Sequence, residues 1–145
     1  MNPKENRELV LKLRFMAVLP EGLKNKVADT LLAISKPRSV PKGGAWIREG
    51  EVTKNKGYIL LAGRVGIRKS NAPEAVCEAP ELLGEIMQFS EAGARTATVV
   101  TLEDCTVLRF MWDDFWSTIE SKVSPKEQID VKQAIESLAW QHFAE

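Results

Sequence analysis

A stretch near the middle of the chain combines residues suited to binding an anion beside a sugar. Gly84 lets the backbone approach a bound group closely, and the amide N–H groups after it have no internal partner if a helix begins there. Arg95 adds a planar guanidinium whose fork matches phosphate oxygens. The carboxylate of Glu85 can accept hydrogen bonds from a sugar hydroxyl. These residues predict a pocket for a small molecule that carries both a phosphate and a ribose.

Each of these residues also has an ordinary structural interpretation. A Gly-Glu pair is commonly a turn, and a single arginine on a strand is commonly a solvated charge. The whole segment 83–99 is more specific, because it reads as a glycine turn, a short amphipathic helical piece, an Ala/Gly link and a strand that opens with arginine. The combination, rather than any single residue, supports the binding hypothesis.

This segment resembles the phosphate-binding cassette of cyclic nucleotide-binding domains. That pattern is Gly-Glu-hydrophobic, a small link, then Arg, a small or hydroxylated residue, Ala and Thr or Ser. The matching residues are Gly84, Glu85, Ile86, Arg95, Thr96, Ala97 and Thr98. The link has the length found in bacterial catabolite activators, one residue longer than in kinase regulatory subunits. Gln88 stands where leucine is frequent and Ala94 where proline is frequent, but neither departure removes a side chain expected to contact the ligand.

The resemblance implies that the ligand is cAMP or cGMP, with no further cofactor and no metal. Arg95 would pair with an equatorial phosphate oxygen, and Thr96 would contact the phosphate through its backbone. Glu85 would accept from the ribose 2′-OH, while Gly84 and Ile86 would supply backbone N–H groups. The ligand-binding residues expected from the resemblance are Leu83, Gly84, Glu85, Ile86, Arg95, Thr96 and Ala97.

The remaining sequence predicts a mainly β fold with flanking helices. Apolar residues recur at helical spacing from about Arg7 to Ile34, and Pro20 interrupts this pattern and can begin a second helix. From Ser39 onward, short strands punctuated by glycines point to a β-roll, a jelly roll or a barrel. The family resemblance implies a double-stranded β-helix, which is a jelly-roll-like β-roll, with N-terminal helices and a C-terminal helix.

Individual strands can also be placed from the pattern. The nearly continuous apolar run 57–63 predicts a strand that is buried on both faces. Residues 75–78 are expected to pair back onto the strand 64–68. Two further strands are expected at 96–101 and 105–110.

Two helices are expected after the last strand. The apolar residues of the first cluster on one side: Trp112, Phe115, Trp116 and Ile119. The sequence 124–127 is a capping box with proline at the first helical position, so it predicts the start of the second helix.

The second of these helices carries two apolar faces. Its wider face, expected to pack on the roll or on the N-terminal helices, consists of Val131, Ala134, Ile135, Leu138 and His142. Its narrower face consists of Ile129, Trp140 and Phe143. Two alternatives stay open for the narrower face. It moves when ligand binds, closing over the pocket or meeting a second copy, or it packs permanently against Trp112 and Trp116.

The 145 residues are expected to form one domain, because this length supports a single sizeable core. Within it we expect a helical lead-in at 1–37, the β-roll at 38–111 and C-terminal helices at 112–145. Lysine and arginine total 20, equal to aspartate and glutamate, which argues against nucleic acid as a partner. No apolar run is long enough to cross a bilayer and no signal peptide is evident, so the cytoplasm is expected and a membrane is not.

An enzymatic function is not expected. The chain has one histidine, His142, and the predicted strands contain none, which excludes a cupin-like metal site on the roll. The two cysteines, Cys77 and Cys105, predict neither a disulfide framework nor a zinc site.

Two non-enzymatic hypotheses follow. In the first, the domain binds a cyclic nucleotide as a regulatory sensor and signals through its C-terminal helix or a partner, which is a second copy or an effector protein. In the second, the roll has no ligand and serves as a docking or dimerisation module. We favour the first, because Glu85 and Arg95 are both present and a charge buried without its ligand would be costly to keep.

Overall fold

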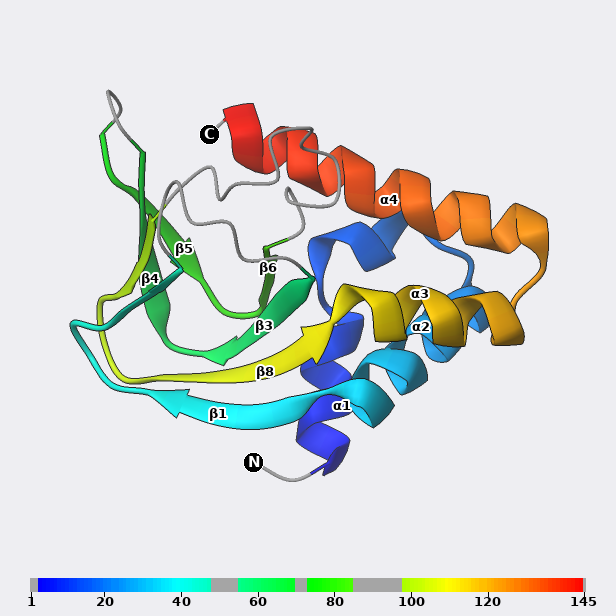
Figure 1. Cartoon of the computed structure of the whole chain (residues 1–145), viewed down its shortest axis with the longest axis horizontal. Coiled ribbons are helices and arrows are strands. Elements are labelled where there is room, and N and C mark those ends of the chain that lie inside the picture. Colours follow the sequence, from blue (N-terminus) through cyan, green and yellow to red (C-terminus); the bar gives the residue numbers. More distant parts are fainter. Residues whose placement is uncertain (1–2, 48–54, 70–72, 85–97, 145) are drawn as a thin grey trace.

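The computed structural model describes residues 3–47, 55–69, 73–84 and 98–144, and of residues 45–47 and 140–144 it describes the backbone alone (Figure 1). The helices are α1 (Pro3–Leu11), the 3-10 helix η1 (Arg14–Val18), α2 (Glu21–Ile34), α3 (Trp112–Lys122) and α4 (Pro125–Ala144). The strands are β1 (Lys36–Val40), β2 (Ala45–Ile47), β3 (Lys56–Ala62), β4 (Arg64–Arg68), β5 (Ala75–Glu78), β6 (Glu81–Leu83), β7 (Thr98–Thr101) and β8 (Cys105–Met111).

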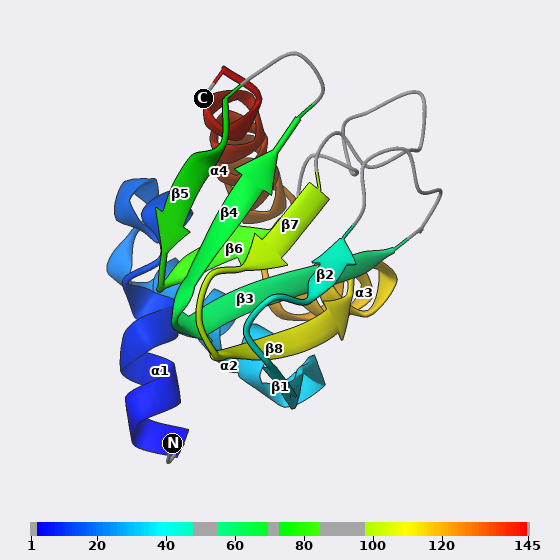
Figure 2. The same cartoon turned by 90° about the vertical axis from the view of Figure 1, so that its left-hand side faces the viewer.

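Within these residues the strands form two antiparallel sheets of four strands each. The first sheet has the order β1-β8-β3-β6 and the second has the order β2-β7-β4-β5. Figure 2 shows the second sheet in front of the first, and Figure 1 shows the helices gathered at one end of the strands. Apart from the β4–β5 hairpin, each described connection between consecutive strands carries the chain from one sheet to the other. The predicted mainly β fold with flanking helices is confirmed.

Strand β3 separates two cores. On one face, Ile59 lies opposite Leu82 and Leu108, and these three pack with the helices. On the other face, Tyr58 lies opposite Leu83. That second face belongs to an inner core between the sheets, formed by Val40, Tyr58, Leu60, Val65, Leu83, Val99, Cys105 and Val107. The predicted strand buried on both faces is therefore confirmed.

The passage from β3 to β4 depends on Gly63. Its φ of +100° lies in the left-handed region, which side chains other than that of glycine rarely adopt. A Cβ at this position would also lie 2.6 Å from Cys105 Sγ and 2.9 Å from the Asp104 carbonyl oxygen. The chain thus changes sheets at a point where there is no room for a side chain. Strand β5 then pairs back onto β4, as the sequence predicted.

The N-terminal helices differ in detail from the sequence prediction. Helix α1 ends at Leu11, so Leu13 and Met16 lie beyond it, and η1 occupies residues 14–18. Phe15 does not fit the helical spacing of its neighbours, and the tighter turn allows Leu13, Phe15 and Met16 to be buried together. Pro20 directly precedes α2, where its carbonyl accepts the N–H of Lys24 at 2.9 Å.

Helix α3 begins at a capped corner after β8. Asn55, which has a φ of +78°, accepts the N–H of Asp113 at 2.7 Å and donates to its carboxylate at 2.8 Å. The Asn55 carbonyl also accepts the N–H of Trp112 at 2.7 Å. The predicted aromatic cluster follows, with Trp112 stacked on Trp116 at a centroid distance of 6.2 Å. Asn55, which is distant from α3 in the sequence, thus accepts hydrogen bonds from the first N–H groups of the helix, which have no partner within it.

Helix α4 starts at the predicted capping box. The Ser124 N–H donates to Glu127 Oε1 at 3.0 Å, and the Glu127 N–H donates to Ser124 Oγ at 3.2 Å. The first of these bonds is the main reason that the pKa of Glu127 is lowered. Four members of the wider apolar face are buried with the helical core: Val131, Ala134, Ile135 and Leu138.

The packing of α4 partly answers the question left open by the sequence. Its wider face packs on η1 and α3, so the expected contact with the N-terminal helices is confirmed. On the narrower face, Ile129 is 55 % exposed. The side chains of Trp140, His142 and Phe143 lie outside the described residues, so the choice between a moving and a static helix end stays a prediction.

Candidate functional site

The structure describes the two ends of the predicted cassette. Leu83 and Gly84 form its start, and Thr98 begins the strand that follows it. The other predicted ligand-binding residues lie outside the described residues: Glu85, Ile86, Arg95, Thr96 and Ala97. Gln88 and Ala94, the two departures from the family pattern, also lie outside them. The roles of these seven positions therefore stay predictions.

The cassette begins at the end of β6. This strand is three residues long and, among the described strands, pairs with β3 alone, with Leu83 opposite Tyr58. Leu83 is buried in the inner core, and Gly84 follows it with a φ of +87°. This left-handed conformation is strained for other residues, so the glycine predicted from the motif is needed where the backbone leaves β6.

The cassette ends on the other sheet. Strand β7 lies between β2 and β4, with Thr98 opposite Arg68 and Val99 opposite Ile67. Val99 is buried in the same inner core as Leu83. The two described ends are thus attached to different sheets (Figure 2). Both ends contribute a side chain to the same apolar interior.

The inner core offers apolar surface and little chemistry. Its titratable side chains are those of Tyr58 and Cys105, and Cys77 packs at its border. Both cysteines are free thiols. Burial, followed by the charge of Glu103, raises the pKa of Cys105, which keeps this thiol protonated and unreactive at neutral pH. Among the described residues no group of three or more His, Cys, Asp or Glu side chains is placed to hold a metal ion.

One charged residue beside the site carried no prediction from the sequence. The structure places Glu81 at the start of β6, with only 5 % of its surface exposed. Its carboxylate Oε2 accepts from Arg14 Nη2 at 2.7 Å and from Arg14 Nε at 2.8 Å. Its Oε1 accepts the N–H of Leu82 at 3.1 Å. The only signal in the sequence was a carboxylate between a proline and two leucines.

The comparisons with known proteins agree with this arrangement. The sequence model of one family, the cyclic nucleotide-binding domain, matches residues 37–122. A search of curated proteins found no match. Among the described helices, none is both long enough and apolar enough to cross a membrane.

Several solved structures share the fold. The catabolite activator protein of Thermus thermophilus is 21 % identical, with a TM-score of 0.66 over 90 % of this chain and 58 % of that one. The sensor domain of the transcriptional regulator DNR from Pseudomonas aeruginosa is 18 % identical, with a TM-score of 0.67 over 94 % and 91 %. The regulatory domain of Toxoplasma gondii PKA, crystallised with cAMP, is 18 % identical, with a TM-score of 0.65 over 81 % and 44 %.

These likenesses confirm the β-roll predicted from the sequence. At such identities they establish the fold alone, and the chain spans about half the length of the PKA and catabolite activator chains. Two of the three structures are described as a regulatory domain and a sensor domain, rather than as enzymes.

Proposed function

The chain belongs to the cyclic nucleotide-binding domain family, and we propose that it binds cAMP or cGMP in its β-roll as a regulatory sensor module. The observation that carries this proposal is the conformation of Gly84. Gly84, the glycine of the cassette pattern, has a φ of +87° at the point where the backbone leaves β6, next to Leu83 of the apolar inner core. The backbone thus requires a glycine at the position where the cassette pattern has one, which supports the assignment of this segment as the cassette.

Different residues of the cassette contact the phosphate and the ribose. Arg95 pairs with the cyclic phosphate, because its planar fork matches two phosphate oxygens. Thr96 contacts the same phosphate, and Glu85 accepts from the ribose 2′-OH. Gly84 and Ile86 add backbone N–H groups, while Leu83 and Ala97 flank the contacts.

The apolar inner core supports the placement of the base. A purine has two apolar faces, and burying them against aliphatic side chains stabilises the complex at about 25 cal/mol per Å² of apolar surface. The inner core contains such side chains from both sheets, among them Leu83 of β6 and Val99 of β7, which are 3 % and 5 % exposed.

The output of the sensor is a change at α4 or in a partner, either a second copy or an effector protein. Helix α4 supports this role because its wider face already packs on the helical layer, while Ile129 on the narrower face is 55 % exposed. The protein acts on its ligand by binding it and carries out no chemical step.

Isothermal titration with cAMP, cGMP and the non-cyclic 5′-AMP tests the proposal. We expect at least one cyclic nucleotide to bind and 5′-AMP to bind far more weakly. A nucleotide at about a hundred times its dissociation constant should stabilise the fold by roughly 2.7 kcal/mol in a thermal melt. If none of the three binds or stabilises the protein, the sensor proposal is wrong and the docking or dimerisation module replaces it.

Arg95→Gln locates the binding site. A charge-assisted hydrogen bond contributes roughly 1.5–3 kcal/mol, so the affinity should fall by about tenfold to more than a hundredfold. Arg64→Gln is the matched control, because Arg64 is a half-exposed arginine of the roll that pairs with Glu103 at 3.4 Å. Equal affinities for the wild type and the Arg95 variant would contradict the assignment of the phosphate contact.

A further inference from the structure

We propose that Arg14 and Glu81 are a positioning pair for the nucleotide site, with the ion pair holding β6 and Gly84 in place from the helical layer. The inference rests on the proposed function, since it concerns the strand from which the cassette starts. Arg14 lies in η1, 67 residues before Glu81 in the sequence. Neither residue belongs to the cassette, so the pair acts on the ligand through Leu83 and Gly84.

The geometry of the pair fixes the start of β6. Both Arg14 Nε and Arg14 Nη2 reach Glu81 Oε2, at 2.8 and 2.7 Å, and the other carboxylate oxygen accepts the N–H of Leu82. The Glu81 side chain is 6 % exposed and that of Arg14 is 43 % exposed. The carboxylate is thus buried with its charge matched, an arrangement in which removal of one partner is costly.

Strand β6 has a short backbone ladder. It is three residues long, and among the described strands it pairs with β3 on one side. Its position therefore depends strongly on its three side chains, all of which are buried. Leu82 anchors one face of β6 in the helical core and Leu83 anchors the other in the inner core, while the ion pair fixes its first residue.

Arg14, the other member of the pair, lies where η1 and α4 pack together. A small cavity of about 50 Å³ between η1 and α4 is lined by Arg14, Phe15, Val18, Ala134, Ser137 and Leu138. Arg14 therefore touches the space between η1 and α4 while its guanidinium holds β6. Replacing Glu81 by a neutral residue removes the ion pair, and the hold of the helical layer on β6 then rests on the packing of Leu82.

The consequence for binding follows from the populations of held and displaced β6. If only a fraction of the molecules holds Gly84 in its binding position, the apparent dissociation constant rises by the inverse of that fraction. Couplings between two sites of one protein typically change an affinity about 5- to 150-fold. We therefore expect a loss of affinity of at least about fivefold when the pair is broken.

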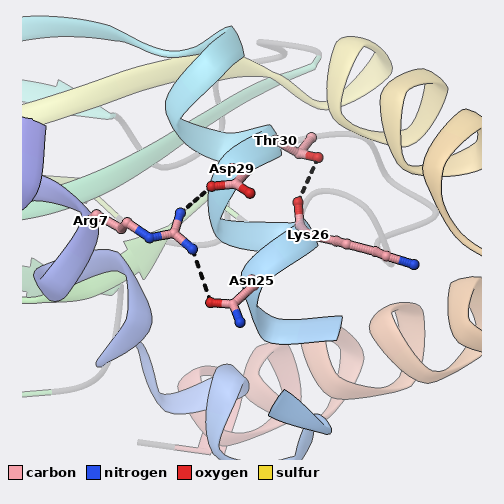
Figure 3. A network of polar contacts seen from close by, with 5 residues as sticks. All are labelled: Arg7, Asn25, Lys26, Asp29 and Thr30. Atoms are coloured by element: carbon pink, nitrogen blue, oxygen red, sulfur yellow. Dashed lines mark hydrogen bonds and ion pairs between the residues drawn. The ribbon is translucent and has the colours of Figure 1, made fainter. Parts of the chain in front are cut away.

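The helical layer provides a matched control in a second arginine. Arg7 of α1 forms an ion pair with Asp29 of α2 and donates to Asn25 Oδ1 at 2.9 Å (Figure 3). Thr30 in the same helix donates to the Lys26 carbonyl at 2.9 Å (Figure 3). This network joins two helices and includes no residue of β6, so Arg7→Gln removes a more exposed ion pair of the helical layer without releasing the strand.

The experiment compares Arg14→Gln, Glu81→Gln, the double variant and Arg7→Gln in the full chain. Titration calorimetry measures the affinities for cAMP and cGMP, and native-state hydrogen exchange measures the opening of the β6 amides. Each single variant of the pair should bind at least about fivefold more weakly, and the double variant no more weakly than the worse single. The amides of β6 should exchange faster in these variants, while those of β3 change in proportion to global stability. Arg14→Lys should restore part of the affinity, because it keeps the charge and loses the fork.

Three results would overturn the positioning role: unchanged affinity, additive losses in the double variant, or an equal loss of affinity in Arg7→Gln. If the wild type binds neither nucleotide, the proposed function fails and hydrogen exchange alone decides the positioning role. In that case, faster amide exchange confined to β6 supports the inference that the ion pair holds this strand in place. Unchanged exchange contradicts that inference.

Discussion

Replacing Gly84 by alanine tests whether the backbone at the start of the cassette determines binding. The φ of Gly84 is +87°, and a left-handed conformation costs a residue with a Cβ roughly 1–2 kcal/mol relative to glycine. If the fold keeps this conformation, the free energy of unfolding falls by that amount. If the backbone relaxes instead, Leu83 and the following amides move away from the ligand and the affinity falls. An energy of one to two kcal/mol corresponds to a factor of roughly 5 to 30.

The assay measures both quantities in the same variant. Urea denaturation gives the free energy of unfolding, and calorimetric titration gives the affinity for cAMP and cGMP. Asparagine tolerates the left-handed region better than alanine does, so Gly84→Asn should lie between the wild type and Gly84→Ala in the affected quantity. Gly22→Ala is the control, because Gly22 lies in the first turn of α2 with open space where a Cβ would stand, so alanine there should not destabilise the fold.

One result would refute this reasoning. If Gly84→Ala keeps both the wild-type stability and the wild-type affinity, the left-handed backbone at Gly84 is not required. The conformation would then no longer support the alignment of the cassette with the fold. A loss of stability with full affinity would instead show that the fold retains the geometry despite the strain.

Three further predictions concern the framework around the site. Gly63→Ala should lower the free energy of unfolding by at least about 2 kcal/mol in urea, because it adds left-handed strain to an overlap with Cys105 Sγ at 2.6 Å. Asn55→Ala should cost roughly 1–2 kcal/mol in the same assay, and Asn55→Gly should separate the lost side-chain bonds to Asp113 from the strain at a φ of +78°. The pKa of Glu127 is lowered below its ordinary value of 4.5, so its contribution to stability is present at neutral pH and is lost as the pH falls below that value through the folded pKa. The stability difference between the wild type and Glu127→Gln should therefore shrink on acidification, and a difference independent of pH would contradict the capping role.

Features that depend on neighbouring residues could be predicted from the sequence. The capping box at 124–127 and the apolar run that forms β3 each carry their signal within a few positions, and both are confirmed. The glycine turn at Gly84 is of the same kind, because only the local backbone decides that a residue without a Cβ is needed there. The cassette as a whole stays a prediction, made from the spacing of residue types along one continuous segment.

Features that depend on distant residues could not be predicted. Asn55 caps α3 from a position 58 residues away from Asp113, and nothing in its local sequence indicates that role. Strand β6 is too short to show an alternating pattern, so no strand was predicted at its three positions. The end of α1 was misplaced because the burial of Phe15, which is set by tertiary packing, overrides the helical spacing of its neighbours.

The environment of Glu81 is also set by distant residues, so the burial of its charge could not be predicted from its place in the sequence. A carboxylate at the start of a short edge strand would normally be solvated, and a solvated ion pair adds little stability. Here the strand lies between the helices and the second sheet, so water cannot reach the carboxylate and the guanidinium of Arg14 must neutralise it. Strand β6, from which the cassette starts, is therefore held to the helical layer by an ion pair, and the strength of this ion pair depends on its burial. For this reason we expect a change at Arg14 to reach the ligand site, although the residue lies in a different layer of the fold.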